Sequence, residues 1–203
     1  MPVTLTGLGE RAHQMSPAVT LGTHVADVVT AVRAEECQEA VLVGHSYGGM
    51  VITGAADALG SEVGRLVYVD GVVPTPGQSW ATAVPPEARD ERRASVARHG
   101  MLPPPPASAF GVHGPDADWV ERRMTPQPPG VLDDPVVFDP GAWLARPRTF
   151  VDCISPALPT IEPSRRLVRS QPGWEVLEVA TGHDPMITAV DDLVAILLEV
   201  AGR

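Results

Sequence analysis

One serine stands between two apolar runs in the stretch VLVGHSYGGMVITG, residues 41–54. Gly44, Ser46 and Gly48 form the pattern G-x-S-x-G, which presents a nucleophile when a strand turns directly into a helix. Such a turn strains the backbone of the serine, and neighbouring glycines leave room for it. The backbone N–H of Tyr47, at the helix N-terminus, can then donate a hydrogen bond to a developing oxyanion. We therefore interpret Ser46 as the nucleophile and Tyr47 as the oxyanion donor.

A serine nucleophile needs a general base, and His183 is the best placed of the six histidines. It lies in ATGHDPM, after the last expected strand and just before the final expected helix. The side chain of His45 should point away from Ser46, and Asp184 is interpreted as a helix-entry or supporting group. The other histidines are expected in solvated loops or on helix surfaces: His13, His24, His99 and His113.

Four short apolar runs are interpreted as buried strands, and three stretches with helical spacing separate or follow them. The expected strands cover residues 40–44, 65–70, 148–153 and 174–179, and the expected helices cover 21–36, 49–60 and 190–201. Strands that alternate with helices predict an α/β fold with a mostly parallel sheet and helices on both faces. Sites in such sheets form at the carboxyl ends of the strands, where Ser46 and His183 both fall.

The composition changes in the middle of the chain, where prolines cluster and the main helical stretch covers only residues 87–99. We expect residues 1–70 and 148–203 to form the core and residues 71–147 to form an inserted cap over the site. The expected substrate-binding residues lie in this cap: Trp80, Phe110, Trp119 and Met124.

The bulk composition narrows the possible partners and surroundings. A formal net charge of −10 argues against a nucleic-acid partner, because phosphate binding needs basic patches. No apolar run approaches the roughly 20 residues of a membrane span, and the N-terminus does not have the pattern of a signal peptide. Cys37 and Cys153 fit no metal or redox spacing, so we expect them to be reduced and buried in a cytoplasmic protein.

Five stretches together resemble the bacterial relatives of plant methylesterases and hydroxynitrile lyases, which have the α/β-hydrolase fold. These stretches are TLTGLGERAH, VLVGHSYGGMVITG, LVYVDGVVP, RMTPQPPG and ATGHDPM, spread over residues 4–186. The resemblance implies that Ser46 is the nucleophile, that His183 is the base and that residues 71–147 are the cap.

The chain departs from this family pattern at its N-terminal side. By comparison with this pattern, we expect that the strands before VTLTGLGER are missing, together with a loop that carries the second oxyanion donor. Either the true start lies upstream, or the protein works without this piece. Thr6 and Gly7, at the end of what should be the first remaining strand, are possible substitutes. An uncovered sheet edge invites pairing with another chain, so we predict a homodimer.

The second departure concerns the acid of the triad. The resemblance places it shortly after RTFVDC, where the chain has Ser155 and Pro156 instead. Asp70, at the end of LVYVD, is our preferred acid because a strand end reaches the site. Asp152 and a serine–histidine pair without an acid are the alternatives.

These residues predict acyl-enzyme chemistry on an ester or thioester, either a small molecule or carrier-bound, with a small apolar or aromatic acyl group, plausibly in secondary metabolism. Hydrolysis and acyl transfer both fit the sequence. A catalytically degenerate scaffold is an alternative, and a hydroxynitrile lyase is a weaker one because the chain contains no lysine for that chemistry. No cofactor or metal site is predicted.

Overall fold

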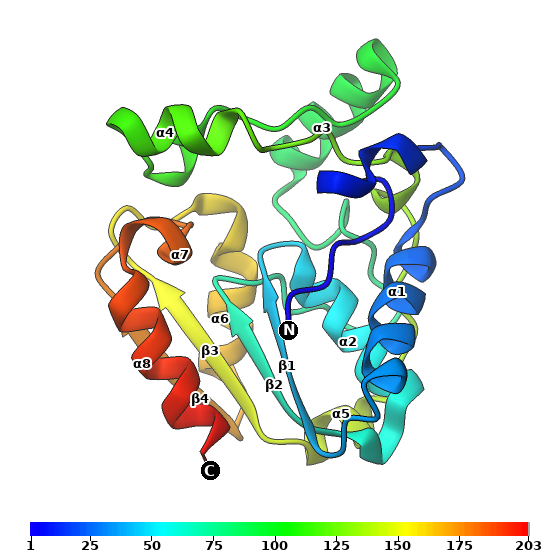
Figure 1. The fold of residues 1–203 in the computed structure, drawn as a ribbon, viewed down its shortest axis with the longest axis vertical. Helices are drawn as coiled ribbons and strands as arrows, with labels where there is room; N and C mark the ends of the chain where they lie inside the picture. Colours follow the sequence, from blue (N-terminus) through cyan, green and yellow to red (C-terminus); the bar gives the residue numbers. More distant parts are fainter. Residues whose placement is uncertain (203) are drawn as a thin grey trace.

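The computed structural model describes residues 1–202, which fold around a four-stranded sheet in the order β1-β2-β3-β4 (Figure 1). The strands are β1 (Ala40–His45), β2 (Val63–Val69), β3 (Arg148–Cys153) and β4 (Trp174–Val179). All three neighbouring pairs are parallel, so the carboxyl ends of the strands share one edge. The predicted α/β fold with a parallel sheet is confirmed.

Helices connect and cover the strands. The α-helices are α1 (Leu21–Ala34), α2 (Gly48–Leu59), α3 (Pro86–His99), α4 (Gly114–Glu121), α5 (Pro140–Ala145), α6 (Glu162–Ser170), α7 (Pro185–Thr188) and α8 (Val190–Ala201). The 3-10 helices are η1 (Gly9–Gln14), η2 (Gly60–Glu62), η3 (Ala107–Phe110), η4 (Pro129–Val131) and η5 (Pro159–Ile161). Local sequence sets several ends: a capping box at Thr20 begins α1, and Gly100, with φ +70°, ends α3.

The two faces of the sheet bury different sets of side chains. Leu66, Tyr68 and Phe150 face the larger core, which also takes in side chains of α1, α2 and α6. Val69 and Val151 face the opposite side and pack with α8. Successive residues of β2 and β3 therefore point to opposite faces, and both faces are buried.

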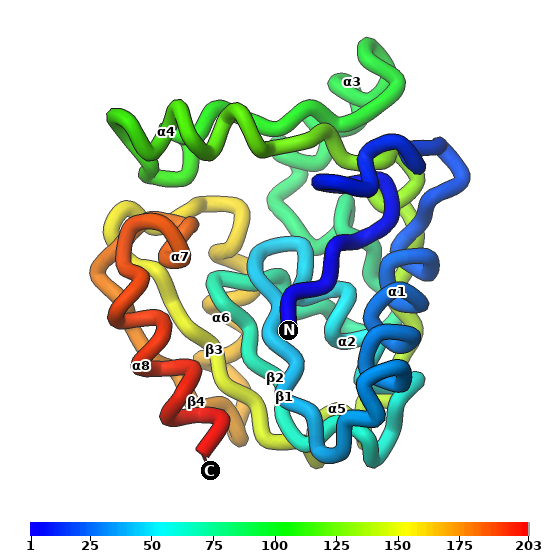
Figure 2. The backbone as a smooth tube through the Cα atoms, viewed as in Figure 1, coloured from blue at the N-terminus to red at the C-terminus, as the bar shows by residue number. Residues whose placement is uncertain are grey.

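The range expected to be a cap, residues 71–147, contains two different parts. Helices α3 and α4 lie beyond the carboxyl ends of the strands, over the site, whereas α5 lies near their opposite ends (Figures 1 and 2). Phe138 and Trp143 belong to the main core, where the indole N–H of Trp143 donates to the hydroxyl of Tyr68 at 3.0 Å. The aromatic residues at the end of this range therefore support the sheet.

The N-terminal segment corrects one expectation, because residues 3–7 do not form a strand. Among residues 1–202, no strand lies beyond β1 to pair with this segment. Its polar groups bond to α1 instead: the N–H and hydroxyl of Thr6 donate to the two carboxylate oxygens of Asp27, at 2.7 and 2.9 Å. Arg11 also pairs with Asp27, at 3.0 Å. A polar anchor therefore replaces sheet pairing at this end.

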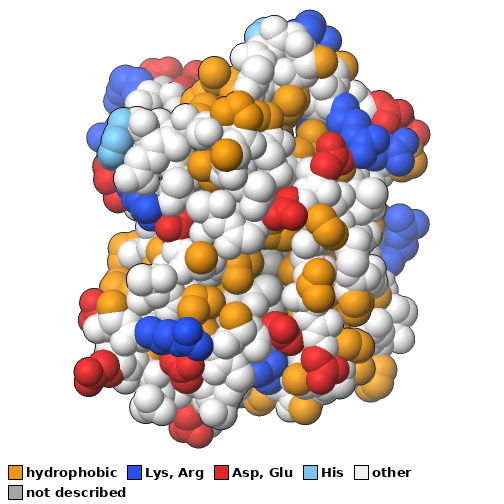
Figure 3. Space-filling model, turned by 90° about the vertical axis from the view of Figure 1, so that its right-hand side faces the viewer, with side chains coloured by type: hydrophobic (Ala, Val, Ile, Leu, Met, Phe, Trp, Pro, Cys, Tyr) orange, Lys and Arg blue, Asp and Glu red, His pale blue; other side chains and the backbone are white. Residues whose placement is uncertain are grey.

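The free edge of β1 borders a groove with a volume of about 500 Å³. Its walls come from residues 1–5, α1, β1 and α2, and its end reaches Gly48 beside the strand-to-helix turn. Val43 in β1 is 45% exposed, and hydrophobic side chains reach the surface on the side of the molecule shown in Figure 3. The homodimer stays a prediction, and light scattering of the purified protein would test it by measuring the molar mass in solution.

Within residues 1–202, no helix combines the length and the apolar character that a membrane crossing needs.

Candidate active site

The turn at Ser46 has the strained geometry that a nucleophile elbow requires. Its φ is +52°, a region that residues other than glycine rarely adopt. The N–H of Ser46 donates to the carbonyl of Val69 at 3.2 Å, and the N–H of Val72 donates to the carbonyl of Ser46 at 2.9 Å. The backbone that follows β2 thus holds this turn from two sides, and strain of this kind is concentrated at functional sites.

Glycines make the close packing of the elbow possible, but one of the two motif glycines is not among those that the packing requires. A Cβ atom on Gly44 would lie 2.5 Å from the carbonyl oxygen of Gly48, and one on Gly49 would lie 2.2 Å from that of Val72. A Cβ on Gly48 would meet no atom within 4 Å. Gly44 and Gly49 are therefore the two glycines that sterics require here.

Asp70 occupies the equivalent position at the end of the next strand. His45 pairs with Val69 in the register of β1 and β2, so Ser46 and Asp70 each follow a paired strand end. The φ of Asp70 is +39°, and its N–H donates to the carbonyl of Val151 at 2.7 Å. Two adjacent strands thus end in a strained residue that carries a reactive side chain.

His183 contacts the carboxylate of Asp70. Its Nδ1 lies 2.7 Å from Oδ2 of Asp70, and both residues are buried. An ionised carboxylate only accepts hydrogen bonds, so Nδ1 carries the proton and Nε2 keeps the lone pair of a base. Asp152, the alternative acid, points elsewhere: its carboxylate pairs with Arg165 and Arg169.

Backbone contacts position the loop that carries His183. The N–H of His183 donates to the carbonyl of Phe110 at 2.9 Å, and the two rings lie 5.3 Å apart. A Cβ on Gly182 would lie 2.4 Å from that same carbonyl, so only glycine lets the cap approach so closely. The backbone of η3 thereby fixes the position of His183 relative to the cap.

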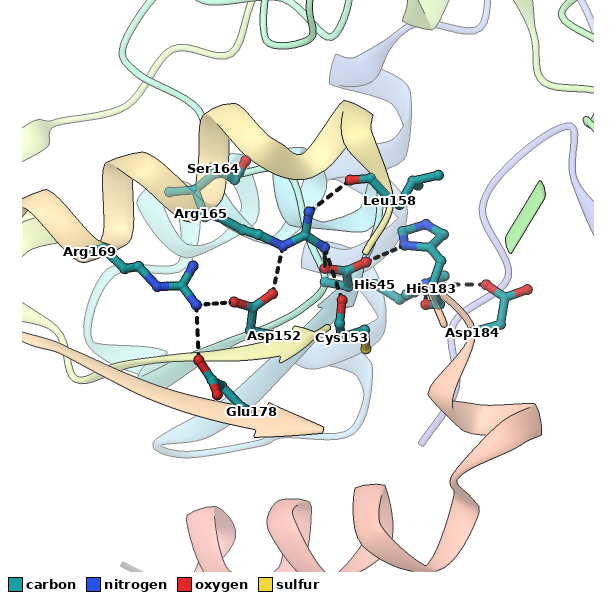
Figure 4. Close-up of polar contacts among 12 residues, drawn as sticks. His45, Asp152, Cys153, Leu158, Ser164, Arg165, Arg169, Glu178, His183 and Asp184 are labelled. Atoms are coloured by element: carbon teal, nitrogen blue, oxygen red, sulfur yellow. Dashed lines mark hydrogen bonds and ion pairs between the residues drawn. The ribbon is translucent and has the colours of Figure 1, made fainter. Parts of the chain in front are cut away.

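His45 lies against the same loop. Its Nε2 donates to the carbonyl of His183 at 2.8 Å and lies 3.5 Å from Oδ1 of Asp184. The two imidazole rings are 4.5 Å apart. Burial, and then the neighbouring His183, lower the pKa of His45 to about 3, so its ring stays neutral. His45 therefore joins the elbow to the loop of the base, as Figure 4 shows together with the nearby ion pairs.

The residue expected to donate to an oxyanion, Tyr47, is buried at the start of α2. No hydrogen-bond acceptor for its backbone N–H occurs within residues 1–202, as is usual for the first N–H groups of a helix. Its side chain is fully engaged: the hydroxyl lies 3.0 Å from Nδ1 of His24, and its ring lies 4.8 Å from that of Trp80.

Two expectations near this residue are wrong. His24 was expected to be solvated, but it is completely buried, with its Nε2 2.8 Å from the carbonyl of Thr6. Thr6 was considered as a second oxyanion donor, but its N–H is bonded to Asp27. The physical reason is the same in both cases: the N-terminal segment folds back onto α1, where it covers His24 and uses its own donors.

The residues expected to bind substrate are not gathered in one place. Phe110 lies against His183, and Trp80 is buried against Tyr47 with the guanidinium of Arg92 above its ring. Met124 packs into a small cluster with the cap helix α4, and Trp119 is 45% exposed beneath Arg123. The structure brings Phe110 to His183 and Trp80 to Tyr47, and it leaves Trp119 at the surface.

Two other sets of potentially reactive groups lie near the site, and their contacts indicate structural roles. His45, His183 and Asp184 have potential metal-ligand atoms within 4.8 Å of one another, but the contacts above already use His45 Nε2 and His183 Nδ1. Burial, and then Asp70 and Asp152, raise the pKa of the Cys153 thiol to about 12, which keeps it protonated and unreactive. Cys153 is buried as expected, whereas Cys37 is half-buried.

Sequence reasoning missed one buried charge beside the site. Arg165 in α6 is 4% exposed and contacts both Asp70 and Asp152 at 2.6 Å. Its spacing contained a clue, because Ile161 and Val168 place this arginine on the buried face of its helix.

Comparison with known proteins agrees with this geometry. A model of the alpha/beta hydrolase family matches residues 2–196. The carbendazim hydrolyzing esterase of Nocardioides sp. (strain SG-4G) is 37% identical over 205 residues, which cover 94% of this chain and 83% of that protein. Alpha/beta hydrolase nvfD of Aspergillus novofumigatus (strain IBT 16806) is 26% identical over 84% of this chain and 73% of its own length.

Solved structures show the same fold at lower identity. Tomato methylketone synthase I, as the H243A variant with beta-ketoheptanoate, aligns with a TM-score of 0.77 and 17% identity over 98% of this chain and 84% of that one. An extracellular alpha/beta-hydrolase from a Paenibacillus species aligns with a TM-score of 0.73 and 19% identity over 83% and 74% of the two chains. The chain therefore belongs to the alpha/beta hydrolase family and is an enzyme of that fold.

Proposed function

We propose that this chain hydrolyses carboxylic esters through an acyl-enzyme on Ser46, with His183 as the base and Asp70 as the acid of a triad. The observation that carries this proposal is the buried contact between His183 and Asp70 beside the strained elbow. An imidazole held in this tautomer has its Nε2 lone pair available to take a proton from a serine hydroxyl. The esterase that is 37% identical to the chain supports the same reaction class.

The reaction follows from these groups in two steps. The oxygen of Ser46 bonds to the acyl carbon while His183 takes its proton, and the N–H of Tyr47 donates to the oxyanion. The alcohol then leaves with the proton from His183. In the second step His183 takes a proton from water, which attacks the acyl carbon; His183 then gives this proton to the oxygen of Ser46 as the bond to the acyl carbon breaks and the acid leaves.

The oxyanion side of the site favours activated acyl donors. Tyr47 offers one backbone donor, and loss of a second donor costs about 3–4 kcal/mol of transition-state stabilisation. Esters with good leaving groups, and thioesters, need less of this stabilisation. Phe110 beside His183 suits a small apolar or aromatic acyl group. Transfer of the acyl group to an acceptor other than water would use the same first step.

The experiment is intact-protein mass spectrometry over time with p-nitrophenyl esters, matched aryl thioesters and carbendazim, run beside Ser46→Ala. Rapid release of free acid that Ser46→Ala loses supports hydrolysis. A lasting adduct on Ser46 that only an added nucleophile discharges indicates acyl transfer instead. Absence of both adduct and turnover with every substrate would argue against acyl-enzyme chemistry and favour a binding protein.

A further inference from the structure

We propose that Arg165 is a positioning residue for the triad: it fixes the carboxylate of Asp70 so that one oxygen is always presented to His183. The inference deepens the proposed function and rests on it. Arg165 comes from α6, and within residues 1–202 its guanidinium and the ring of His183 are the two side-chain groups that contact the carboxylate of Asp70.

The two oxygens of Asp70 have separate partners. Oδ2 lies 2.7 Å from Nδ1 of His183, and Oδ1 accepts a hydrogen bond from Nη2 of Arg165 at 2.6 Å. The side chain of Asp70 is completely buried, so water cannot take the place of either partner. With both oxygens bonded, rotation of the carboxylate would break a charge-assisted hydrogen bond. Arg165 thereby limits Asp70 to the orientation that keeps the base in its reactive tautomer.

The guanidinium itself is held on every side. Its Nε donates to Asp152 Oδ1 at 2.6 Å, Nη1 to the carbonyl of Leu158 at 2.8 Å, and Nη2 also to the carbonyl of Cys153 at 3.2 Å. The planar fork of an arginine suits this set of fixed acceptors, whereas a lysine could satisfy only part of it. Figure 4 shows Arg165 between Asp152 and the carbonyls of Leu158 and Cys153.

Charge balance explains why the network of ion pairs around Arg165 extends from the buried carboxylates to the surface. Two completely buried carboxylates, Asp70 and Asp152, would leave one buried negative charge if Arg165 were their only cationic partner. Arg169 supplies the second positive charge: it pairs with Asp152 and, at 3.2 Å, with Glu178, and its side chain is 44% exposed. Buried charges need partners of this kind. Asp152 therefore acts on the triad only through Arg165.

The placement of this network suits a chain whose acid comes from β2. Arg165 fastens the loop between Cys153 and Leu158, which contains Ser155 and Pro156 and no carboxylate. The same loop that could have carried an acid instead buttresses the arginine that orients Asp70. The helix after β3 and the end of β2 are thereby combined into one support for His183.

The test compares Arg165→Lys, Arg165→Gln and Asp152→Asn with Arg166→Gln as the matched control. Arg166 is the next residue in α6, its side chain is 72% exposed, and the one ion pair that it makes within residues 1–202 is with Glu162 at 3.7 Å. With p-nitrophenyl acetate we expect kcat to fall about 10²-fold in Arg165→Gln, as for a misplaced catalytic group, with KM nearly unchanged. Arg165→Lys should recover part of this loss, and Asp152→Asn should lose less than Arg165→Gln.

A second readout does not depend on turnover. The proton between His183 Nδ1 and Asp70 should give a downfield proton NMR resonance, assigned by its loss in His183→Gln. We expect this resonance to weaken or shift in Arg165→Lys and Asp152→Asn and to persist in Arg166→Gln. Arg165→Lys and Asp152→Asn retain part of the network, so they keep the test possible if Arg165→Gln does not fold. Lower melting temperatures with an unchanged resonance and unchanged kcat would overturn the positioning role.

The two proposals fail in different ways. If the wild type shows no adduct or turnover with any ester but the resonance depends on Arg165, the proposed function fails and the positioning of Asp70 stands. If Ser46→Ala abolishes turnover while every Arg165 variant keeps the wild-type kcat and resonance, the proposed function stands and the role of Arg165 fails.

Discussion

The acid–base half of the site and its oxyanion half are built very differently. Around His183, each hydrogen-bonding group of Asp70 has a fixed partner, and the charges of the network are balanced inside the protein. Around Tyr47, the backbone N–H has no hydrogen-bond acceptor among residues 1–202, the nearby N–H of Thr6 is bonded to α1, and a groove opens along β1. Because several elements together hold the contact between Asp70 and His183, this contact is preorganised, and proton transfer requires such preorganisation.

The difference teaches which half limits the chemistry. Under the proposed mechanism, a well-positioned base activates Ser46 for many acyl donors, whereas Tyr47 as the assigned oxyanion donor would stabilise the charged intermediate only in part. The chain should therefore attack readily and discriminate strongly by leaving group. Variants in the two halves should then give different kinetic patterns, and the expected effects range from a nearly complete loss of activity to a small change in stability.

The largest effect should come from Asp70→Asn. An amide in place of the carboxylate can hold His183 in the wrong tautomer, which in a serine triad lowers kcat by about 10⁴-fold. Steady-state kinetics with p-nitrophenyl acetate measure this change, and Asp133→Asn, an exposed substitution far along the chain, is the control. A loss of less than tenfold would mean that Ser46 and His183 work as a pair without an acid.

The leaving-group dependence tests the oxyanion half. The ratio of kcat/KM for a p-nitrophenyl ester to that for the matching ethyl ester should be large, because a site without a second donor loses about 10²–10³-fold in kcat on the harder step. The comparison needs one acyl group and several alcohols of graded acidity. A flat dependence across the series would indicate that a second donor completes the site when substrate binds.

Much of the fold could be predicted from the sequence, and particular residues show why the rest could not. The sequences of β3 and β4 predicted both strands to the residue, because each is a short stretch with β-branched and aromatic residues that no glycine or proline interrupts. Residues 3–7 have an equally suitable strand sequence, yet they form none, because strand formation depends on a neighbour to pair with. The local sequence pattern of a segment indicates that it can form a strand, but it does not show whether a neighbouring strand is present to pair with it.

The same limit applies to the candidate site. Ser46 and His183 could be placed because short motifs fix their local geometry. The contact between Asp70 and His183 joins residues 113 positions apart, and it depends on a register that no single segment encodes. Arg165 is further removed, since it acts through Asp70, and a charged residue on an apolar helix face was its only trace in the sequence. The role of each group in catalysis stays a prediction.

The acid sensitivity of the fold should reflect His24. Burial is the main cause of its lowered pKa, and its neutral ring is fully bonded between Tyr47 and Thr6. A group whose pKa is lower in the folded state stabilises the fold fully above its unfolded value of about 6.5, and this stabilisation is lost as the pH falls toward the folded value. The melting temperature should therefore decrease as the pH is lowered below about 6.5, and this decrease should be less steep in His24→Gln.

The smallest effect should come from the anchor of the N-terminal segment. Asp27→Asn removes a charge that pairs with Arg11 and weakens two hydrogen bonds from Thr6. Because Arg11 is partly exposed, we expect a loss of about 1–2 kcal/mol in the free energy of unfolding. Urea titration measures this loss, and Arg33→Gln, which removes a more exposed ion pair with Glu62, is the control.

The kinetics of Asp27→Asn then sharpen the comparison between the two halves. If the N-terminal segment only covers His24, the variant should keep kcat within about twofold of the wild type, as a surface-side change without contact to the reacting atoms does. A larger fall that is specific to esters with poor leaving groups would show that the segment shapes the oxyanion half. A rise for the same esters would show that releasing Thr6 from Asp27 makes its N–H available as the second donor.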